Sequence, residues 1–180
     1  YWRELLTQLK DRKFKWFTET DLSVSQDDPL LELMRQSGCA QVLIGFESPT
    51  PAALQGVDLH NDWKFKHFAR YKEAIQNIQS HGVTVNGCFV IGLDGHDETI
   101  FERIYDFVKE TELYEVQVTI LTPFPGTPLY ERLRGEGRLL APADWTRCTL
   151  FDLNFTPLNM SAEALVLGFK SLVNRLYDGE

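Results

Sequence analysis

Apolar residues gather in four short runs along the chain, and segments with a helical pattern separate them. The runs cover residues 14–20, 41–46, 83–93 and 115–121, and the run at 41–46 is almost continuously apolar. Such runs are typical of parallel strands covered on both faces. We predict the order βαβαβαβ, an α/β fold with a parallel sheet and right-handed crossovers. This pattern fits part of a barrel and part of an open, doubly wound sheet equally well.

The segments around these runs carry apolar residues at three- and four-residue spacing, which predicts amphipathic helices. Pro29 suits the first turn of the second helix, and Gly38 and Gly82 suit the positions just after two helix ends. Thr99 and Glu102 have the spacing of a capping box. We expect helices over residues 1–10, 28–37, 62–81, 99–112, 129–134 and about 162–177.

The composition is that of a globular protein with one substantial core, with 180 residues of which 43% are hydrophobic. No apolar run is long enough to span a bilayer. The net charge of −8 argues against a nucleic-acid partner, which needs a basic surface to neutralise phosphates. Cys39, Cys88 and Cys148 are odd in number and far apart. We therefore expect inert thiols in a reducing cytoplasm and neither a disulfide framework nor a metal site.

Acidic residues and stiff loops follow the predicted strands, where α/β proteins bind their ligands. Glu19 and Glu47 end two strands, so their carboxylates either face a ligand or are simply solvated. Residues 92–98 form an acidic, glycine-containing turn without the glycine spacing or the lysine of phosphate-binding loops. His96 in this turn is a minor candidate for metal or acid–base chemistry. The proline-rich residues 122–128 suit either the wall of a flat ring site or a plain connection.

Taken together, the strand ends resemble the later half of a radical S-adenosylmethionine (SAM) enzyme. The likeness covers most of residues 14–140 and implies a partial (β/α)6 barrel of TIM type. The chain starts at Tyr1 in a helical pattern, so we expect a barrel truncated at its N-terminus, in a piece of a longer protein. The matching residues are Gly38-Cys39, Ile44 to Ser48, Gly82-Val83, Gly87 to Leu93, Glu98-Thr99 and Leu121 to Tyr130.

The resemblance implies roles for individual residues. Glu47 and Ser48 would approach the ribose and the methionine moiety of SAM, and Glu19 would face the substrate or SAM. Two further groups of residues would line the adenine ring after the next two strands. They are Val90, Ile91 and Gly92, and Leu121, Thr122, Pro123 and Phe124. The resemblance assigns no metal ligand to this chain.

The chain departs from the family pattern at three places. Pro49 replaces the glycine that usually follows Glu-Ser, which puts the SAM contact at that turn in question. The acidic turn at 92–99 replaces the common G-x-P-G-E-T sequence and resembles the cobalamin-dependent branch, which includes hopanoid and tetrapyrrole methylases. The C-x3-C-x2-C motif that holds the [4Fe–4S] cluster does not occur in this sequence. We therefore expect the chain to be inactive by itself.

The resemblance predicts that the parent is an enzyme, a methyltransferase or a relative that cleaves SAM reductively and takes a small-molecule substrate. Residues 1–140 would be the C-terminal portion of the barrel, and residues 141–180 an extension that ends in a helix. The edge left open by truncation suggests a dimer. Two alternatives stay open on the residues alone. One is a TIM-barrel lyase using Glu19, Glu47 and His96, and the other is a non-catalytic α/β interaction module.

Overall fold

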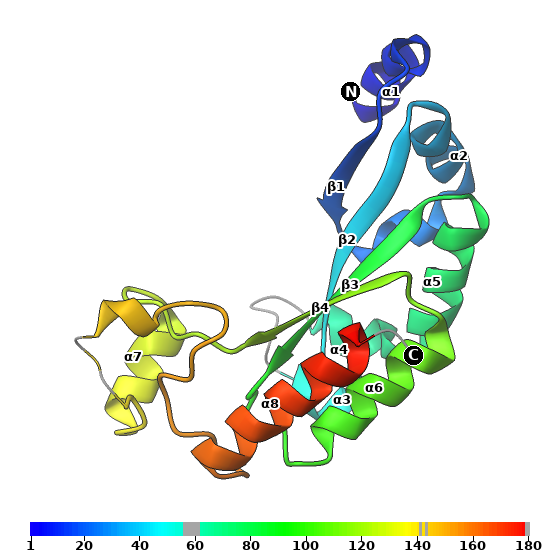
Figure 1. The fold of residues 1–180 in the computed structure, drawn as a ribbon. Coiled ribbons are helices and arrows are strands. Elements are labelled where there is room, and N and C mark those ends of the chain that lie inside the picture. Colours follow the sequence, from blue (N-terminus) through cyan, green and yellow to red (C-terminus); the bar gives the residue numbers. More distant parts are fainter. Residues whose placement is uncertain (56–61, 141, 143, 179–180) are drawn as a thin grey trace.

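A parallel sheet forms the centre of the computed structural model (Figure 1), which describes residues 1–55, 62–140, 142 and 144–178. Within these residues the strand order is β1-β2-β3-β4, and every neighbouring pair is parallel. The strands are β1 (Trp16–Thr20), β2 (Cys39–Glu47), β3 (Thr84–Ile91) and β4 (Glu115–Ile120). The predicted βαβαβαβ order is therefore confirmed.

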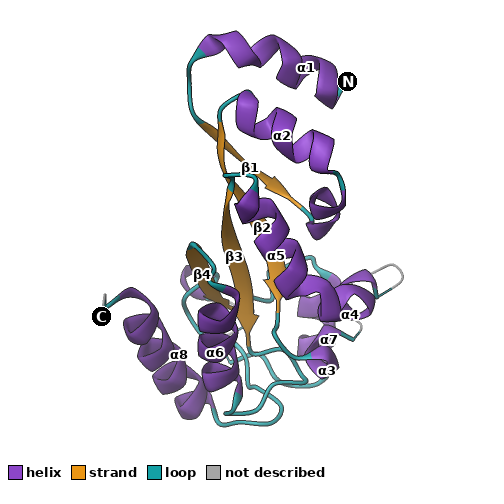
Figure 2. Cartoon of the chain, turned by 90° about the vertical axis from the view of Figure 1, so that its right-hand side faces the viewer, coloured by secondary structure: helices purple, strands orange, loops and turns teal. Residues whose placement is uncertain are grey.

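The longer helices lie on one side of the sheet (Figures 1 and 2). Successive right-handed crossovers between neighbouring strands place their helices on the same face of the sheet. The helices therefore cover that face. The α-helices are α1 (Trp2–Leu9), α2 (Asp28–Gln36), α3 (Pro51–Leu54), α4 (Trp63–His67), α5 (Tyr71–Ser80), α6 (Ile100–Thr111), α7 (Pro128–Gly135) and α8 (Ala162–Tyr177). The short 3₁₀ helices are η1 (Lys10–Arg12), η2 (Leu22–Gln26), η3 (Phe68–Arg70) and η4 (Trp145–Arg147).

The prediction of one continuous helix over residues 62–81 is wrong. The segment is divided into α4, η3 and α5, with joints where His67 and Arg70 have φ near −100° and ψ near 0°. Aromatic packing accompanies these joints, because the Trp63 ring stacks on His67 and the Phe68 ring contacts Tyr71. These ring contacts depend on the tertiary fold, and the spacing of apolar residues does not encode them.

The capping box predicted at Thr99 and Glu102 is also wrong. Thr99 already has helical dihedrals and makes no side-chain cap. Its backbone N–H and its hydroxyl both donate to the Asp97 carboxylate, at 2.9 and 2.5 Å. Glu102 instead pairs with Arg175 on α8 at 2.7 Å, because that guanidinium lies across the helix interface. The real caps of α2, α7 and α8 are the side chains of Asp27, Thr127 and Ser161.

The two faces of the sheet differ in chemistry. Side chains that point to the helices are apolar and buried, and on β2 they are Val42, Ile44 and Phe46. Side chains that alternate with them point to the opposite face, which we call the inner face. On the inner face Gln41 of β2 donates to Glu115 of β4 at 2.7 Å, across the intervening strand β3. Two long side chains on the inner face thus bridge strands that are not neighbours.

The C-terminal segment packs into the same core as the sheet. Leu165 and Leu172 of α8 are buried in it, and α8 lies against α6. Gly168 sits at this contact, where an added Cβ would lie 2.1 Å from the Phe101 ring. The helices approach this closely because position 168 has no side chain. The domain boundary between residues 140 and 141 stays a prediction.

We expect Gly168→Ala to lower the free energy of unfolding by about 1–2 kcal/mol, because the strain of moving the Phe101 ring exceeds the gain in helix propensity. Gly135→Ala in α7 is the matched control, since nothing lies within 4 Å of its added Cβ. That control should leave stability unchanged or slightly raised. Urea unfolding measures both variants, and equal effects would exclude close packing at position 168.

Candidate functional site

The carboxyl ends of the strands meet at one edge of the sheet, which we call the carboxyl edge. Strands β2 and β3 end there at Glu47 and Ile91, and β4 runs on into Leu121, whose N–H donates to the Ile91 carbonyl at 2.8 Å. The structure therefore brings together the three groups of residues that the sequence marks as a ligand site. Parallel strands always align their ends in this way, which makes the carboxyl edge the natural place for a site.

Glu47 ends β2 in an unusual backbone conformation. Its φ is 64°, and the register with β3 shifts between Gly45 and Glu47. Its Oε1 lies 2.6 Å from the Nζ of Lys64, and both side chains are only about a fifth exposed, at 21% and 23%. The sequence pattern does not reveal Lys64, because it is 17 residues away and lies in a segment predicted as an uninterrupted helix.

Ser48 and His96 form a buried hydrogen-bond chain behind this strand end. The Gly92 N–H donates to His96 Nδ1 at 3.3 Å, which leaves Nε2–H to donate to the Ser48 hydroxyl at 2.9 Å. Ser48 Oγ also accepts from the Thr50 N–H at 3.1 Å. The chain ties the turn after β2 to the turn after β3. The Ser48 side chain is fully buried, so a contact with SAM stays a prediction and would need the main chain.

Burial keeps His96 neutral. The imidazole is 2% exposed, and this burial lowers its pKa to about 4, although the nearby Asp97 carboxylate acts in the opposite direction. Both ring nitrogens are used in the hydrogen-bond chain. His96 is therefore a structural residue that positions two turns, and its geometry disfavours acid–base catalysis or metal binding.

The three predicted residues at the end of β3 point in different directions. Val90 is partly exposed on the inner face, whereas Ile91 is fully buried on the helix side. Gly92 has φ 99°, and an added Cβ would lie 2.8 Å from the Phe155 ring. Among them only Val90 can offer its side chain to a ligand on the inner face, while Ile91 and Gly92 can offer main-chain atoms.

The residues after β4 also divide into exposed and buried groups. Thr122 and Pro123 are buried, and the Thr122 hydroxyl donates to the Thr149 carbonyl at 2.6 Å. Phe124 is 41% exposed. Leu121 lines a cavity of about 470 Å³, formed by residues that follow three consecutive strands. The cavity lies between α3, the acidic turn and α7, and its walls include Ala52, Ala53, Leu93, Gly95, Leu121, Leu129 and Arg132.

The acidic turn is held by arginines that no sequence pattern indicated. Asp94 pairs with Arg132 of α7 at 2.5 Å and with Arg138 at 2.9 Å, and the Asn159 amide donates to its carbonyl at 2.6 Å. Burial would raise the pKa of Asp94, but the hydrogen bonds from the two arginines outweigh it and hold this pKa below its usual value. These contacts fasten the turn after β3 to the C-terminal segment.

Carboxylates surround a free thiol on the inner face. Burial raises the pKa of Cys88 to about 11, and the negative charges of Glu47, Glu19 and Glu115 act in the same direction. Glu19 of β1 is exposed, in agreement with a role facing a ligand, although that role stays a prediction. The Cys88 thiol is protonated at neutral pH and donates to the Gln117 side chain.

Cys39, Cys88 and Cys148 are all free thiols in the structure. Within the part of the chain that the structure describes, no three His, Cys, Asp or Glu side chains are grouped so as to hold a metal ion. His60 lies outside the described residues. The donor set of this chain therefore does not fit a [4Fe–4S] cluster, which needs thiolates close together.

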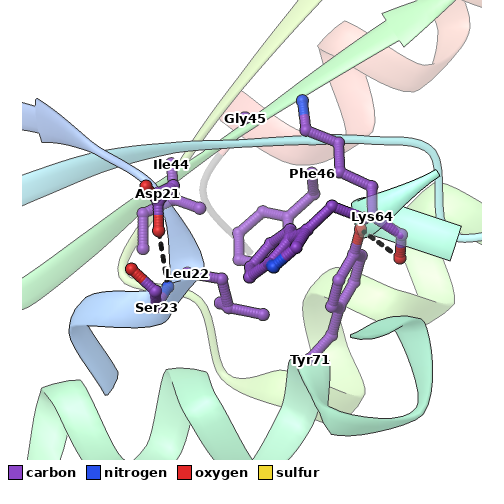
Figure 3. A pocket seen from close by; sticks show the side chains of 9 residues that line it. Asp21, Leu22, Ser23, Ile44, Gly45, Phe46, Lys64 and Tyr71 are labelled. Carbon is purple, nitrogen blue, oxygen red and sulfur yellow. Dashed lines mark hydrogen bonds between the residues drawn. The ribbon is translucent and has the colours of Figure 1, made fainter. Parts of the chain in front are cut away.

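A second cavity of about 310 Å³ opens beyond the end of β1 (Figure 3). The rings of Phe46, Trp63 and Tyr71 contribute to its lining, and Lys64 also borders it. Because β1 ends at Thr20, no strand among the described residues pairs with the last residues of β2 on this side. The cavity therefore gives access to the β2 backbone next to the Glu47–Lys64 ion pair.

Three comparisons relate this chain to known proteins. Residues 127–180 match a family model described as a domain of unknown function, DUF4070. The bacteriochlorophyllide d C-12(1)-methyltransferase of Chlorobaculum tepidum is 28% identical over 179 residues, which are 99% of this chain and 38% of that protein. The hopanoid C-2 methylase of Rhodopseudomonas palustris is 30% identical over 122 residues, 68% of this chain and 22% of that protein. The chain thus spans well under half the length of these relatives.

The fold is also found in a solved structure. TsrM from Kitasatospora setae, a radical S-adenosylmethionine methyltransferase solved with cobalamin and a [4Fe–4S] cluster bound, superposes with a TM-score of 0.59 at 15% identity. The match covers 91% of this chain and 33% of that one. This likeness confirms the predicted fold class, a partial barrel of TIM type with parallel strands.

The buried His96 should make stability depend on pH. A group whose folded pKa lies near 4 and whose unfolded pKa lies near 6.5 contributes stability above pH 6.5 and loses it as the pH falls toward 4. We expect the free energy of unfolding to fall by about 2 kcal/mol from this group between pH 7.5 and pH 5.

His96→Gln is the matched variant for this measurement, since it keeps polar atoms near Ser48 but does not titrate. The pH dependence of its unfolding free energy should be smaller than that of the native chain by the same amount. Identical pH dependence in the two proteins would show that His96 titrates normally.

Proposed function

The chain belongs to the radical SAM proteins, in their cobalamin-dependent branch and in the C-terminal part of their barrel, and on this premise we propose that the whole protein is a SAM-dependent methyltransferase. The observation that carries the proposal is the convergence of Glu47, the end of β3 and Leu121 at the carboxyl edge. A relative named as a methyltransferase that matches 99% of the chain supports it.

The residues at the carboxyl edge fit SAM. The cavity of about 470 Å³ has apolar walls from Leu93, Leu121 and Leu129, which suit one face of an adenine ring. The Oε2 atom of Glu47 accepts no hydrogen bond from the described residues and suits a ribose hydroxyl. Val90 and the main chain of Gly92 would extend this wall along β3. These roles are proposals drawn from the geometry and from the family resemblance.

One molecule of SAM would supply the methyl group, and a second, cleaved with an electron from a [4Fe–4S] cluster, would supply a 5′-deoxyadenosyl radical and release methionine. We propose that the thiolates of that cluster lie in other parts of the protein, because the cysteines of this chain are not grouped. A cobalamin would be a further cofactor, since TsrM, which shares the fold, was solved with cobalamin bound. Residues of this chain would bind and orient SAM and keep water from the inner face.

The two alternative functions are less well supported. A lyase that uses Glu19, Glu47 and His96 would need a histidine that can exchange protons, and both nitrogens of His96 are buried and occupied. The carboxyl-edge cavity of about 470 Å³ favours binding of a small molecule over a purely interacting module. The small-molecule substrate is part of the proposal, and its identity stays open.

The predictions of a dimer and of a cytoplasmic location also stay open. Dimerisation through the free edge of β1 remains a proposal, which the mass in solution by light scattering would test. No helix in the described residues has the length and apolar character needed to cross a membrane. The predicted location in the cytoplasm remains untested.

We expect the full protein, reconstituted with iron and sulfide without oxygen, to form 5′-deoxyadenosine from SAM when reduced. The isolated chain of 180 residues should form none.

Glu47→Gln in the full protein should weaken SAM affinity by roughly five- to tenfold, because a carboxylate is a stronger acceptor than an amide. Equilibrium titration and product chromatography measure these outcomes.

Glu4→Gln in α1 is the control, since Glu4 is exposed and far along the chain from the site. It should bind SAM like the unmodified protein. Failure of the reduced full protein to consume SAM would contradict the proposed function, and unchanged affinity in Glu47→Gln would remove Glu47 from the site.

A further inference from the structure

The Lys64 side chain extends from a short helix to the end of strand β2. It lies on α4, and its ammonium contacts Glu47 at the end of β2 at 2.6 Å. Figure 3 shows its side chain extending along the wall of the smaller cavity toward β2. Since less than a quarter of each side chain is exposed, water screens this pair less than it screens a surface ion pair.

Gly45 makes room for this contact. A Cβ built on Gly45 would lie 2.6 Å from Glu47 Oε1 and 3.5 Å from Lys64 Nζ. The ion pair therefore lies directly over the Gly45 backbone, on the inner-face side of β2, and any larger residue at this position would displace it. The left-handed conformation of Glu47 brings its carboxylate back over its own strand.

The contact uses only one oxygen of the Glu47 carboxylate. Lys64 donates to Oε1, and no described residue donates to Oε2. A glutamate at the end of a strand would otherwise rotate freely about its side-chain bonds, and ordering it on binding would cost free energy. With Oε1 anchored, fewer orientations of the carboxylate remain, so Oε2 is partly ordered before a ligand arrives.

We propose that Lys64 is a positioning residue for the SAM site: it anchors Glu47 Oε1 over Gly45 so that Oε2 is held ready for a hydroxyl of the ligand. This inference rests on the proposed function. It assigns Lys64 no contact with the ligand, so its effect on SAM binding passes through Glu47. A lysine that served only to tether α4 would act on stability and not through Glu47.

The test measures SAM affinity of the reconstituted full protein for Lys64→Met, Lys64→Arg and Glu47→Gln. Lys66→Met is the matched control, because Lys66 lies on the same short helix and is exposed. We expect Lys64→Met to weaken SAM binding by roughly two- to tenfold, because the Glu47 side chain, no longer anchored, must then be ordered on binding. Lys64→Arg should restore affinity to within about threefold, and Lys66→Met should have no effect.

The double variant Lys64→Met with Glu47→Ala separates positioning from tethering. If Lys64 acts only through Glu47, the double variant binds SAM no more weakly than Glu47→Ala alone, because alanine leaves no carboxylate to position. Gly45→Ala is an independent variant that keeps both charges but displaces the pair, and it should weaken binding as Lys64→Met does. The melting temperature of each variant shows whether the fold is intact.

Three results would overturn the inference: unchanged affinity in Lys64→Met, additive losses in the double variant, or normal affinity in Glu47→Gln. The third would also remove Glu47 from the site. None of them bears on whether the reduced protein cleaves SAM, so the proposed function stands or fails on product formation alone.

Discussion

The parallel pairing of the four strands is the constraint on which the rest of the structure depends. It fixes the alternation of side chains, so that Val42, Ile44 and Phe46 reach the helices while Gln41 and Glu47 reach the inner face. It also places every strand end at one edge. The core and the candidate site are thus two results of the same hydrogen-bond ladder, because a shift of one residue would exchange the two faces.

Polar contacts join the strand ends to one another. His96 links the turns after β2 and β3 through Ser48 and Gly92, and Asp94 links the turn after β3 to Arg132 and Arg138. Such networks are directional and costly to break when they are partly buried. They give the loops of the carboxyl edge a defined geometry without filling the inner face with apolar side chains, and the cavity there remains open.

The sequence predicts elements well where a local pattern determines them. The four strands are found at their predicted places because apolar runs bounded by turns need no distant partner to be recognised. The break in residues 62–81 could not be predicted, since it depends on rings such as Trp63 that meet in the folded chain. The prediction of a capping box at Thr99 was wrong because Glu102 pairs with Arg175, which is 73 residues away in the sequence.

The same distinction applies to the candidate site. Glu47, Val90 and Leu121 were identified from strand ends and family likeness, and the structure places them at one edge. The residues that hold the strand ends in place could not be identified from the sequence. Lys64 and Arg138 are brought close to their partners, Glu47 and Asp94, only by the tertiary fold. The family likeness also does not tell which face of a strand would contact a ligand. It therefore grouped the partly exposed Val90 with the buried Ile91.

The carboxylates around Cys88 have a consequence for the chemical durability of the inner face. Because Glu47, Glu19 and Glu115 and the burial of the thiol all disfavour the thiolate, Cys88 carries its proton at any physiological pH. A protonated thiol is a poor nucleophile and a poor ligand for iron, and it is slow to enter disulfide exchange or oxidation to sulfenic acid. The inner face of the sheet can therefore include a sulfur atom that stays chemically inert.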